Sequence, residues 1–134
     1  MNRRGFTLVE IMVVVVILGI LAVLIVPRVL GRTDEARAAA AKHDVATLMQ
    51  SLKLYKLDNG RYPSNEEGLA ALVSPPAGLQ NWHGPYIKRG VPNDPWGAPY
   101  VYRFPGSHNA GGYDLMSMGS DGREGNDDIT NWTK

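Results

Sequence analysis

The sequence predicts an α+β protein in which one long N-terminal α-helix packs on a small antiparallel β-sheet. The helix is predicted because residues 11–26 contain no polar side chain and residues 45–55 repeat apolar side chains at helical spacing. The sheet is predicted because residues 100–104 and 113–118 carry alternating, β-favouring side chains on either side of a Gly-rich segment. A chain of 134 residues is long enough for one compact domain and an appendage.

The composition argues against several classes of function. The formal net charge is +1, so no nucleic acid or other strong polyanion is indicated as a partner. The chain has 0 cysteines, which excludes disulfides, thiolate metal sites and a cysteine nucleophile. The histidines share no metal-ligand spacing, and no nucleophile elbow, P-loop or dinucleotide fingerprint occurs. We therefore predict that the protein is not an enzyme, although a Ser–His–Asp arrangement assembles in space and is not excluded by sequence.

The first element is a segment of membrane length. Residues 6–26 are apolar except for Thr7 and Glu10, and as a helix they extend ~30 Å, about the thickness of a bilayer core. Arg3 and Arg4 precede the segment. Basic residues there predict that the N-terminal end stays in the cytoplasm and that the rest of the chain lies beyond the membrane.

Three hypotheses account for this segment. A secretory signal peptide has a basic start and an apolar centre, but no small-residue cleavage site closes this run, which ends in Val26-Pro27-Arg28. An ordinary membrane anchor leaves Glu10 unexplained, because an acid in hydrocarbon costs about 2.5–3.5 kcal/mol. In the third hypothesis, Glu10 has a cationic partner within the membrane, as ionisable residues in bilayers usually do.

Residues 3–10, RRGFTLVE, closely resemble the class III leader of type IV pilins and type II secretion pseudopilins. The resemblance implies that a prepilin peptidase cleaves between Gly5 and Phe6 and methylates the new amino group of Phe6. Cleavage exposes a charged amine at Phe6. Glu10 of one subunit can then pair with this amine of a neighbour in a helical filament, which satisfies both charges and sets the axial register.

The helix is expected to continue beyond the membrane. Pro27 marks either a weak point that extends when the subunit enters a filament, as in similar proteins, or a simple kink. An apolar stripe follows at i, i+3, i+4, i+7 and i+10, formed by Val45, Leu48, Met49, Leu52 and Tyr55. Asn59-Gly60 is a typical C-terminal stop, so the predicted helix covers residues 6–58.

After the helix, residues 65–73 predict a short second helix that turns Leu69, Leu72 and Val73 inward. Between it and the sheet, aromatic side chains stand among prolines. A sugar- or peptide-binding surface is one interpretation. Core packing is favoured, because small domains depend on Tyr and Trp for buried area.

The motif order in residues 94–125, from DPWG through YDL to DG and the final Gly, resembles the major pseudopilins of type II secretion systems. It is less similar to adhesive or DNA-uptake pilins. Many type IV pilins also carry a C-terminal cysteine pair, which this chain lacks. The resemblance therefore extends from the leader through the C-terminal part of the chain.

Residues 119–129, GSDGREGNDDI, form an acidic, Gly-rich segment near the C-terminus. The chemistry leaves two interpretations open: a calcium site, since calcium prefers oxygen ligands on flexible loops, or a tight turn at Asp121-Gly122 with solvated acids. The spacing is not that of an EF-hand. The resemblance implies calcium, held by the side chains of Asp121, Asp127 and Asp128 and by the backbone carbonyls of Met118, Ser120 and Arg123.

Together these features predict the major structural subunit of a type II secretion pseudopilus, in the bacterial inner membrane. Residues 1–5 are the leader, residues 6–27 the single transmembrane assembly helix, and residues 28–134 a periplasmic pilin-like domain with a calcium-binding C-terminal loop. The implied partners are other copies of this chain, minor pseudopilins, the prepilin peptidase and the inner-membrane assembly platform. The resemblance also implies that the resulting fibre exports folded proteins through the outer-membrane secretin. Three alternatives remain: a type IV pilin of a surface pilus, an anchored calcium-binding module that does not polymerise, and an anchored hydrolase.

Overall fold

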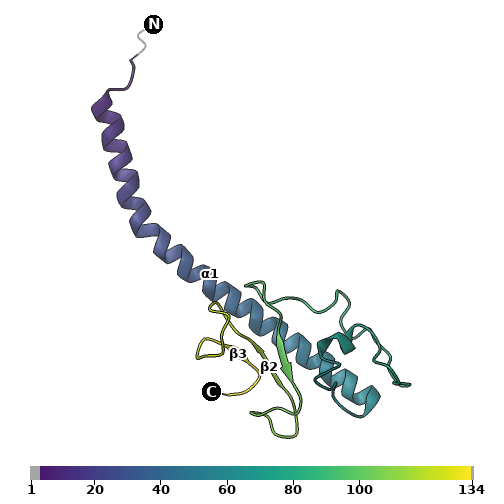
Figure 1. The fold of residues 1–134 in the computed structure, drawn as a ribbon. Coiled ribbons are helices and arrows are strands. Elements are labelled where there is room, and N and C mark those ends of the chain that lie inside the picture. The colour runs from purple at the N-terminus through teal and green to yellow at the C-terminus, as the bar shows by residue number, and fades with distance from the viewer. Residues whose placement is uncertain (1–3, 134) are drawn as a thin grey trace. The chain divides into compact units, whose positions relative to one another are not determined.

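The computed structural model describes residues 4–133, with the side chains of residues 26–31 outside the description. It contains one long helix, α1 (Leu8–Asn59), a 3₁₀ turn, η1 (Leu69–Leu72), and three short strands (Figure 1). The strands are β1 (Val101–Arg103), β2 (Asp114–Ser117) and β3 (Ile129–Thr130). The chain divides into two compact units, Met1–Ala36 and Arg37–Lys134. The predicted α+β class, a long helix with a small antiparallel sheet, is confirmed.

The start of α1 is set by Thr7. Its Oγ1 accepts the backbone N–H of Glu10 at 3.2 Å, and its carbonyl oxygen accepts the N–H of Ile11 at 3.2 Å. A threonine followed three residues later by a glutamate is the capping-box pattern of a helix N-terminus. Helix formation therefore begins just after Gly5 and Phe6, which lie in an exposed segment without regular structure.

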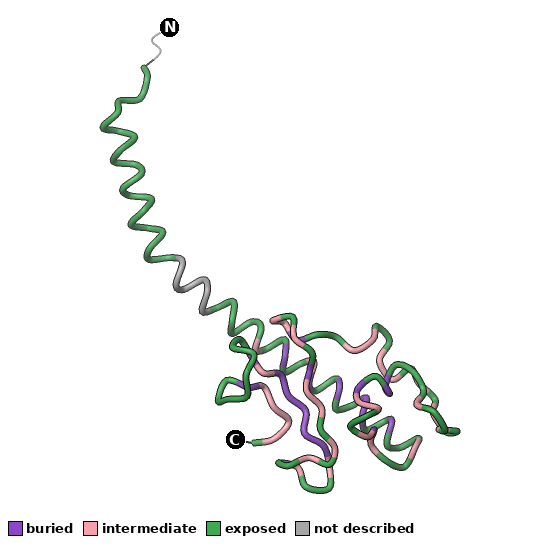
Figure 2. Tube along the Cα trace, in the orientation of Figure 1, coloured by how far each residue is buried: buried purple, intermediate pink, exposed green. Residues whose placement is uncertain are grey.

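The first unit contains a helical segment, Leu8–Ile25, whose surface is apolar except for Glu10. Leu8–Ile25 has a mean hydropathy of 3.2, and 0% of this segment is buried within the structure (Figure 2). By length and composition the segment can cross a membrane. A helix that is apolar on all sides needs apolar surroundings. The predicted weak point at Pro27 concerns a side chain that lies outside the described residues.

The second unit is built on the C-terminal part of α1. Four residues of the predicted stripe are buried: Val45, Leu48, Leu52 and Tyr55. The remaining residue of the stripe, Met49, was wrongly predicted to be buried, because it is 37% exposed. Ser51 is buried instead and donates its hydroxyl hydrogen to the carbonyl oxygen of Tyr86 at 3.1 Å. The loop at Tyr86 thus covers the Ser51 side of α1, and Met49 lies outside the covered face.

The three strands form one antiparallel sheet in the order β1-β2-β3. Tyr102 pairs with Leu115, and Ser117 pairs with Ile129. The first pairing confirms the predicted hairpin between residues 100–104 and 113–118. The strand β3 was not predicted, because its two residues are too short a segment to show alternation.

The predicted helix over residues 65–73 is reduced to η1. Gly68 has φ 58°, a left-handed conformation that interrupts a right-handed helix. Leu69 and Leu72 are buried as predicted, whereas Val73 is 38% exposed and was wrongly placed inward.

The aromatic residues lie largely in or against the core. Tyr100 and Tyr113 are buried, and the rings of Tyr62 and Tyr113 pack edge to face with centroids 4.8 Å apart. Trp82 donates its indole N–H to the carbonyl oxygen of Ala71 at 2.8 Å. Such contacts combine a large apolar area with a satisfied polar atom.

Candidate functional site

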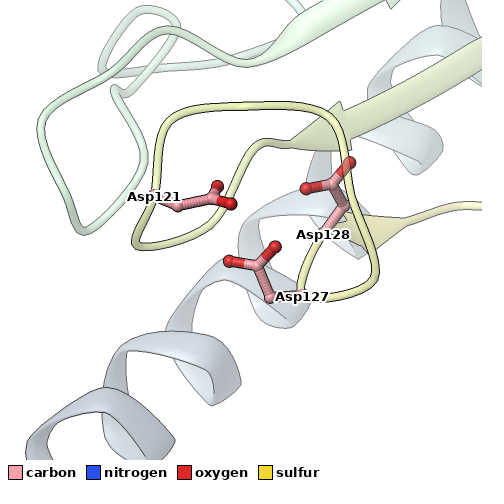
Figure 3. Close-up of side chains that lie close together, drawn as sticks. All are labelled: Asp121, Asp127 and Asp128. Atoms are coloured by element: carbon pink, nitrogen blue, oxygen red, sulfur yellow. The ribbon is translucent and has the colours of Figure 1, made fainter.

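The acidic segment of the sequence folds as the loop between β2 and β3. We call residues 118–128 the metal loop. Its base is closed by the pairing of Ser117 with Ile129. We call Asp121, Asp127 and Asp128 the acidic triad, and their carboxylates converge inside this loop (Figure 3). One carboxylate oxygen from each lies within 4.8 Å of the others. The structure therefore brings together the three side chains that the sequence analysis assigned to a metal.

Asp128 gives the triad a polar atom that lacks a protein partner. Asp128 is 9% exposed, and its Oδ2 accepts the N–H of Gly125 at 2.9 Å. Its Oδ1 is buried without a hydrogen-bond donor. A buried carboxylate oxygen without a donor, beside two further carboxylates, is costly unless a cation is present. The triad thus has the charge and the free oxygen that a cation requires.

The glycines of the metal loop make room for the carboxylates. Gly119 has φ 71°, and a Cβ there would lie 2.8 Å from Oδ2 of Asp127. A Cβ at Gly125 would lie 3.4 Å from Oδ1 of Asp127 and 4.0 Å from both the Arg123 carbonyl oxygen and Asp121 Oδ2. The Arg123 carbonyl therefore lies in the neighbourhood of the triad. As metal ligands, the carbonyls of Met118, Ser120 and Arg123 all stay predictions.

Another charged side chain of the metal loop, Glu124, bonds outside the acidic triad. Asp121 Oδ1 accepts the N–H of Arg123 at 2.9 Å, which folds the loop locally. The side chain of Glu124 forms an ion pair with Arg103 at 2.8 Å. Both partners of that pair are about half exposed, so it contributes little stability. Hard oxygen donors on a Gly-rich loop suit a divalent cation such as calcium better than a soft metal.

Replacing Gly119 by alanine is expected to damage this site more than the same change at Gly122. Both glycines have positive φ, 71° and 68°, where a Cβ costs about 1–2 kcal/mol. At Gly122 nothing lies within 4 Å of the added Cβ, whereas at Gly119 the carboxylate and carbonyl of Asp127 obstruct it. We expect Gly119→Ala to lose about 1–3 kcal/mol more of the free energy of unfolding.

Denaturant unfolding of the two variants, with and without added calcium, measures this difference. Only Gly119→Ala should also weaken the stabilisation by the ion, because it displaces a ligand. Equal losses in both variants would show that Gly119 matters only for its backbone conformation.

The residues predicted to act in processing and assembly lie in the first unit. Phe6 is 79% exposed and Gly5 is exposed beside it, so their peptide bond is accessible. Glu10 is exposed in the first turn of α1. The sequence analysis did not assign a role to Thr7. The T-x-x-E spacing from Thr7 to Glu10 was the signal that could have identified it as the helix cap.

The histidines take no part in the acidic site. His108 stacks on Trp132 with ring centroids 4.1 Å apart, and His83 Nδ1 lies 2.6 Å from the carbonyl oxygen of Asn81. Within residues 4–133, neither they nor His43 belong to a cluster able to hold a metal ion. Among the described residues, the acidic triad is therefore the only group of three or more acidic or histidine side chains placed to hold a metal ion.

Three features define a pilin-like subunit: an exposed segment at Gly5 and Phe6, the apolar segment Leu8–Ile25 of membrane length, and a small sheet that shares a core with the C-terminal part of α1. Residues 1–26 match the model of the prokaryotic N-terminal methylation motif, and residues 28–132 match that of type II secretion system protein G. The chain belongs to the type II secretion system protein G family.

Relatives and a solved structure agree with this assignment. The type II secretion system core protein G of Pseudomonas aeruginosa is 51% identical over 98% of this chain and 99% of its own length. That of Klebsiella pneumoniae is 50% identical over 98% and 96%, respectively. The crystal structure of the major pseudopilin from the type 2 secretion system of enterohaemorrhagic Escherichia coli matches with a TM-score of 0.67 and 40% identity, covering 77% of this chain and 92% of that one.

The family assignment confirms the predicted function at this level. The chain is a structural pseudopilin of the type II secretion system and is not an enzyme. A type IV pilin of a surface pilus, the alternative from sequence, is set aside because the protein G match covers residues 28–132. The N-terminal helix and the family together agree with a membrane-anchored subunit.

Proposed function

We propose that this chain polymerises through its N-terminal helices into the pseudopilus, and that growth of this fibre exports folded proteins through the outer-membrane secretin. One observation carries the proposal: Leu8–Ile25 is wholly exposed and apolar, and its first turn carries a single acid, Glu10. Packing many such helices together covers this surface. The acid then needs a cation, which the amine of a processed Phe6 supplies.

We place the subunit in the inner membrane with residues 28–134 in the periplasm. The basic start of the chain favours a cytoplasmic N-terminus. The partners we propose are other copies of this chain, minor pseudopilins, the assembly platform and the prepilin peptidase. The exposed Gly5-Phe6 peptide bond supports the last of these.

We propose calcium as the ion of the acidic triad. Calcium takes several oxygen ligands in flexible geometry, and the triad with nearby carbonyls supplies oxygen only. The bound ion would offset two of the three negative charges of Asp121, Asp127 and Asp128 and hold the metal loop closed. In a chain with 0 cysteines, this provides a cross-link that a disulfide cannot.

The intact mass and N-terminal residue of the protein from membranes test the proposed processing. We expect a chain that begins at N-methylated Phe6 in cells with prepilin peptidase. Cells without the peptidase provide the control and should contain a chain that begins at Met1. An unprocessed chain in both strains would contradict the filament proposal, because Glu10 would then have no amine partner.

A further inference from the structure

A buried polar pair joins the turn at Asp94 to Ser117, the last residue of β2. Asp94 is 4% exposed and Ser117 is 0% exposed. The Ser117 hydroxyl donates to Oδ2 of Asp94 at 2.7 Å, across 23 residues of sequence. A buried carboxylate is tolerated only where donors satisfy it. This pair lies outside the acidic triad, and the function described above does not use it.

On one side, the Asp94 carboxylate closes a turn over residues 94–98. Its Oδ1 accepts the N–H groups of Trp96 at 3.1 Å and Ala98 at 2.8 Å. The N–H of Asp94 donates to the carbonyl oxygen of Ala98 at 2.7 Å. Both oxygens of the carboxylate are therefore engaged, and the turn has little freedom to move independently of Ser117.

On the other side, Ser117 holds the start of the metal loop. Its Oγ accepts the N–H of Gly119 at 3.2 Å, in a buried position. Gly119 lies directly against Asp127, since a Cβ on it would be 2.8 Å from the Asp127 carboxylate. Ser117 also pairs with Ile129, the residue that follows Asp128. The Ser117 hydroxyl thus links the Asp94 turn to the start of the metal loop, and the backbone of Ser117 pairs at the end of that loop.

We propose that Asp94 and Ser117 are positioning residues for the metal site, and that metal binding and ordering of the 94–98 turn are coupled. The inference rests on the proposed calcium site. The Ser117 hydroxyl keeps Gly119 in its left-handed conformation and so keeps Asp127 beside Asp121 and Asp128. Coupling of this kind is reciprocal: if the turn supports the ion, the ion also orders the turn.

Calcium titration of the full chain in detergent micelles tests the proposal. Ser117→Ala removes the link, and Asp94→Asn keeps an acceptor for the turn but weakens the bond to Ser117. We expect affinity for calcium alone to fall about tenfold in Ser117→Ala, within the range usual for groups that support metal ligands. Leu115→Ala is the control, because Leu115 is a buried core residue of the same strand that hydrogen-bonds to Asn131 and not to this pair. Its calcium affinity should match that of the parent.

Hydrogen exchange gives the second readout. If Ser117 only stabilised the fold, its replacement would not abolish the effect of calcium on the 94–98 turn. Calcium should slow exchange of the Trp96 and Ala98 amides in the parent and in Leu115→Ala, but not in Ser117→Ala. Unchanged affinity in folded Ser117→Ala and Asp94→Asn would overturn the proposal, as would an equal loss in Leu115→Ala. If Ser117→Ala does not fold, Asp94→Asn decides. A parent that binds no calcium would overturn the metal site itself, which the parent titration shows before any variant is compared.

Discussion

Replacing Glu10 by alanine is expected to leave the subunit in the membrane and to abolish its assembly into filaments. Insertion should be unimpaired, because removing an acid from an apolar helix spares about 2.5–3.5 kcal/mol. Assembly should fail, because the amine of Phe6 loses its partner. An unpaired charge in such surroundings costs about 3–5 kcal/mol, which is on the order of a hundredfold or more in association constant.

Glu10 is also the acid in the first turn of α1, where a carboxylate favours the helix N-terminus, and the control must separate this role. The N–H of Glu10 bonds to Thr7 Oγ1, so the residue is part of the helix N-terminus. Thr7→Ala removes this cap, at about 1 kcal/mol, and keeps the carboxylate. Glu10→Gln keeps the shape of the side chain and removes its charge. We expect filaments from Thr7→Ala and none from Glu10→Gln.

Quantifying sheared filaments by immunoblot and electron microscopy, beside the membrane-bound pool, measures these outcomes. Normal filaments from Glu10→Ala would rule out the charge pair. An equal defect in Thr7→Ala would assign the effect to the start of α1 rather than to contact between subunits.

Removing calcium is expected to lower the thermal midpoint of the C-terminal domain by about 10 °C or more. An ion at a hundred times its dissociation constant stabilises by about 2.7 kcal/mol, and each kcal/mol shifts the midpoint of a domain of this size by about 4–8 °C. The physical reason is the triad, where a buried Oδ1 of Asp128 has no protein donor. Added magnesium should restore less of the lost thermal midpoint than calcium, since magnesium demands a more rigid coordination geometry.

Asp128→Asn and Glu124→Gln are the matched variants for this prediction. Each removes one negative charge from the metal loop, but the Glu124 carboxylate bonds to Arg103 outside the triad. We expect Asp128→Asn to lose the response to calcium and, in chelator, to be no less stable than the parent, because it relieves repulsion. Glu124→Gln should respond as the parent does. Scanning calorimetry with chelator and with calcium measures both, and a calcium response kept by Asp128→Asn would exclude this site.

The helical part of the fold was predictable because its signals are local. An apolar run of membrane length and an apolar repeat of about 3.6 residues can both be recognised in a single sequence. The same holds for the stop at Gly60, which has φ 77° and donates its N–H to the carbonyl oxygen of Lys56 at 2.7 Å. Met49 and Val73 were misplaced, because whether a residue at the edge of a stripe is covered depends on where a distant loop crosses it.

The acidic triad was predicted from a resemblance rather than from spacing. The chemistry of residues 119–129 alone left a solvated turn equally open. The short strand β3 is what closes the loop, and its pairing with Ser117 could not be seen in two residues. The pair of Asp94 and Ser117 left no sequence signal, because neither residue type nor spacing shows that the two side chains meet.

The sequence by itself determined the helix of membrane length with its one acid, Glu10, and the apolar stripe beyond it. It also determined that acidic side chains, which can act as oxygen ligands, are concentrated near the C-terminus. These depend on composition and on contacts between residues a few positions apart. Only the tertiary structure decided which face of α1 is covered, how the metal loop is closed and that Asp128 has a buried oxygen without a donor. Each of these depends on contacts between segments far apart in the chain. Such long-range contacts leave no periodic pattern in a single sequence.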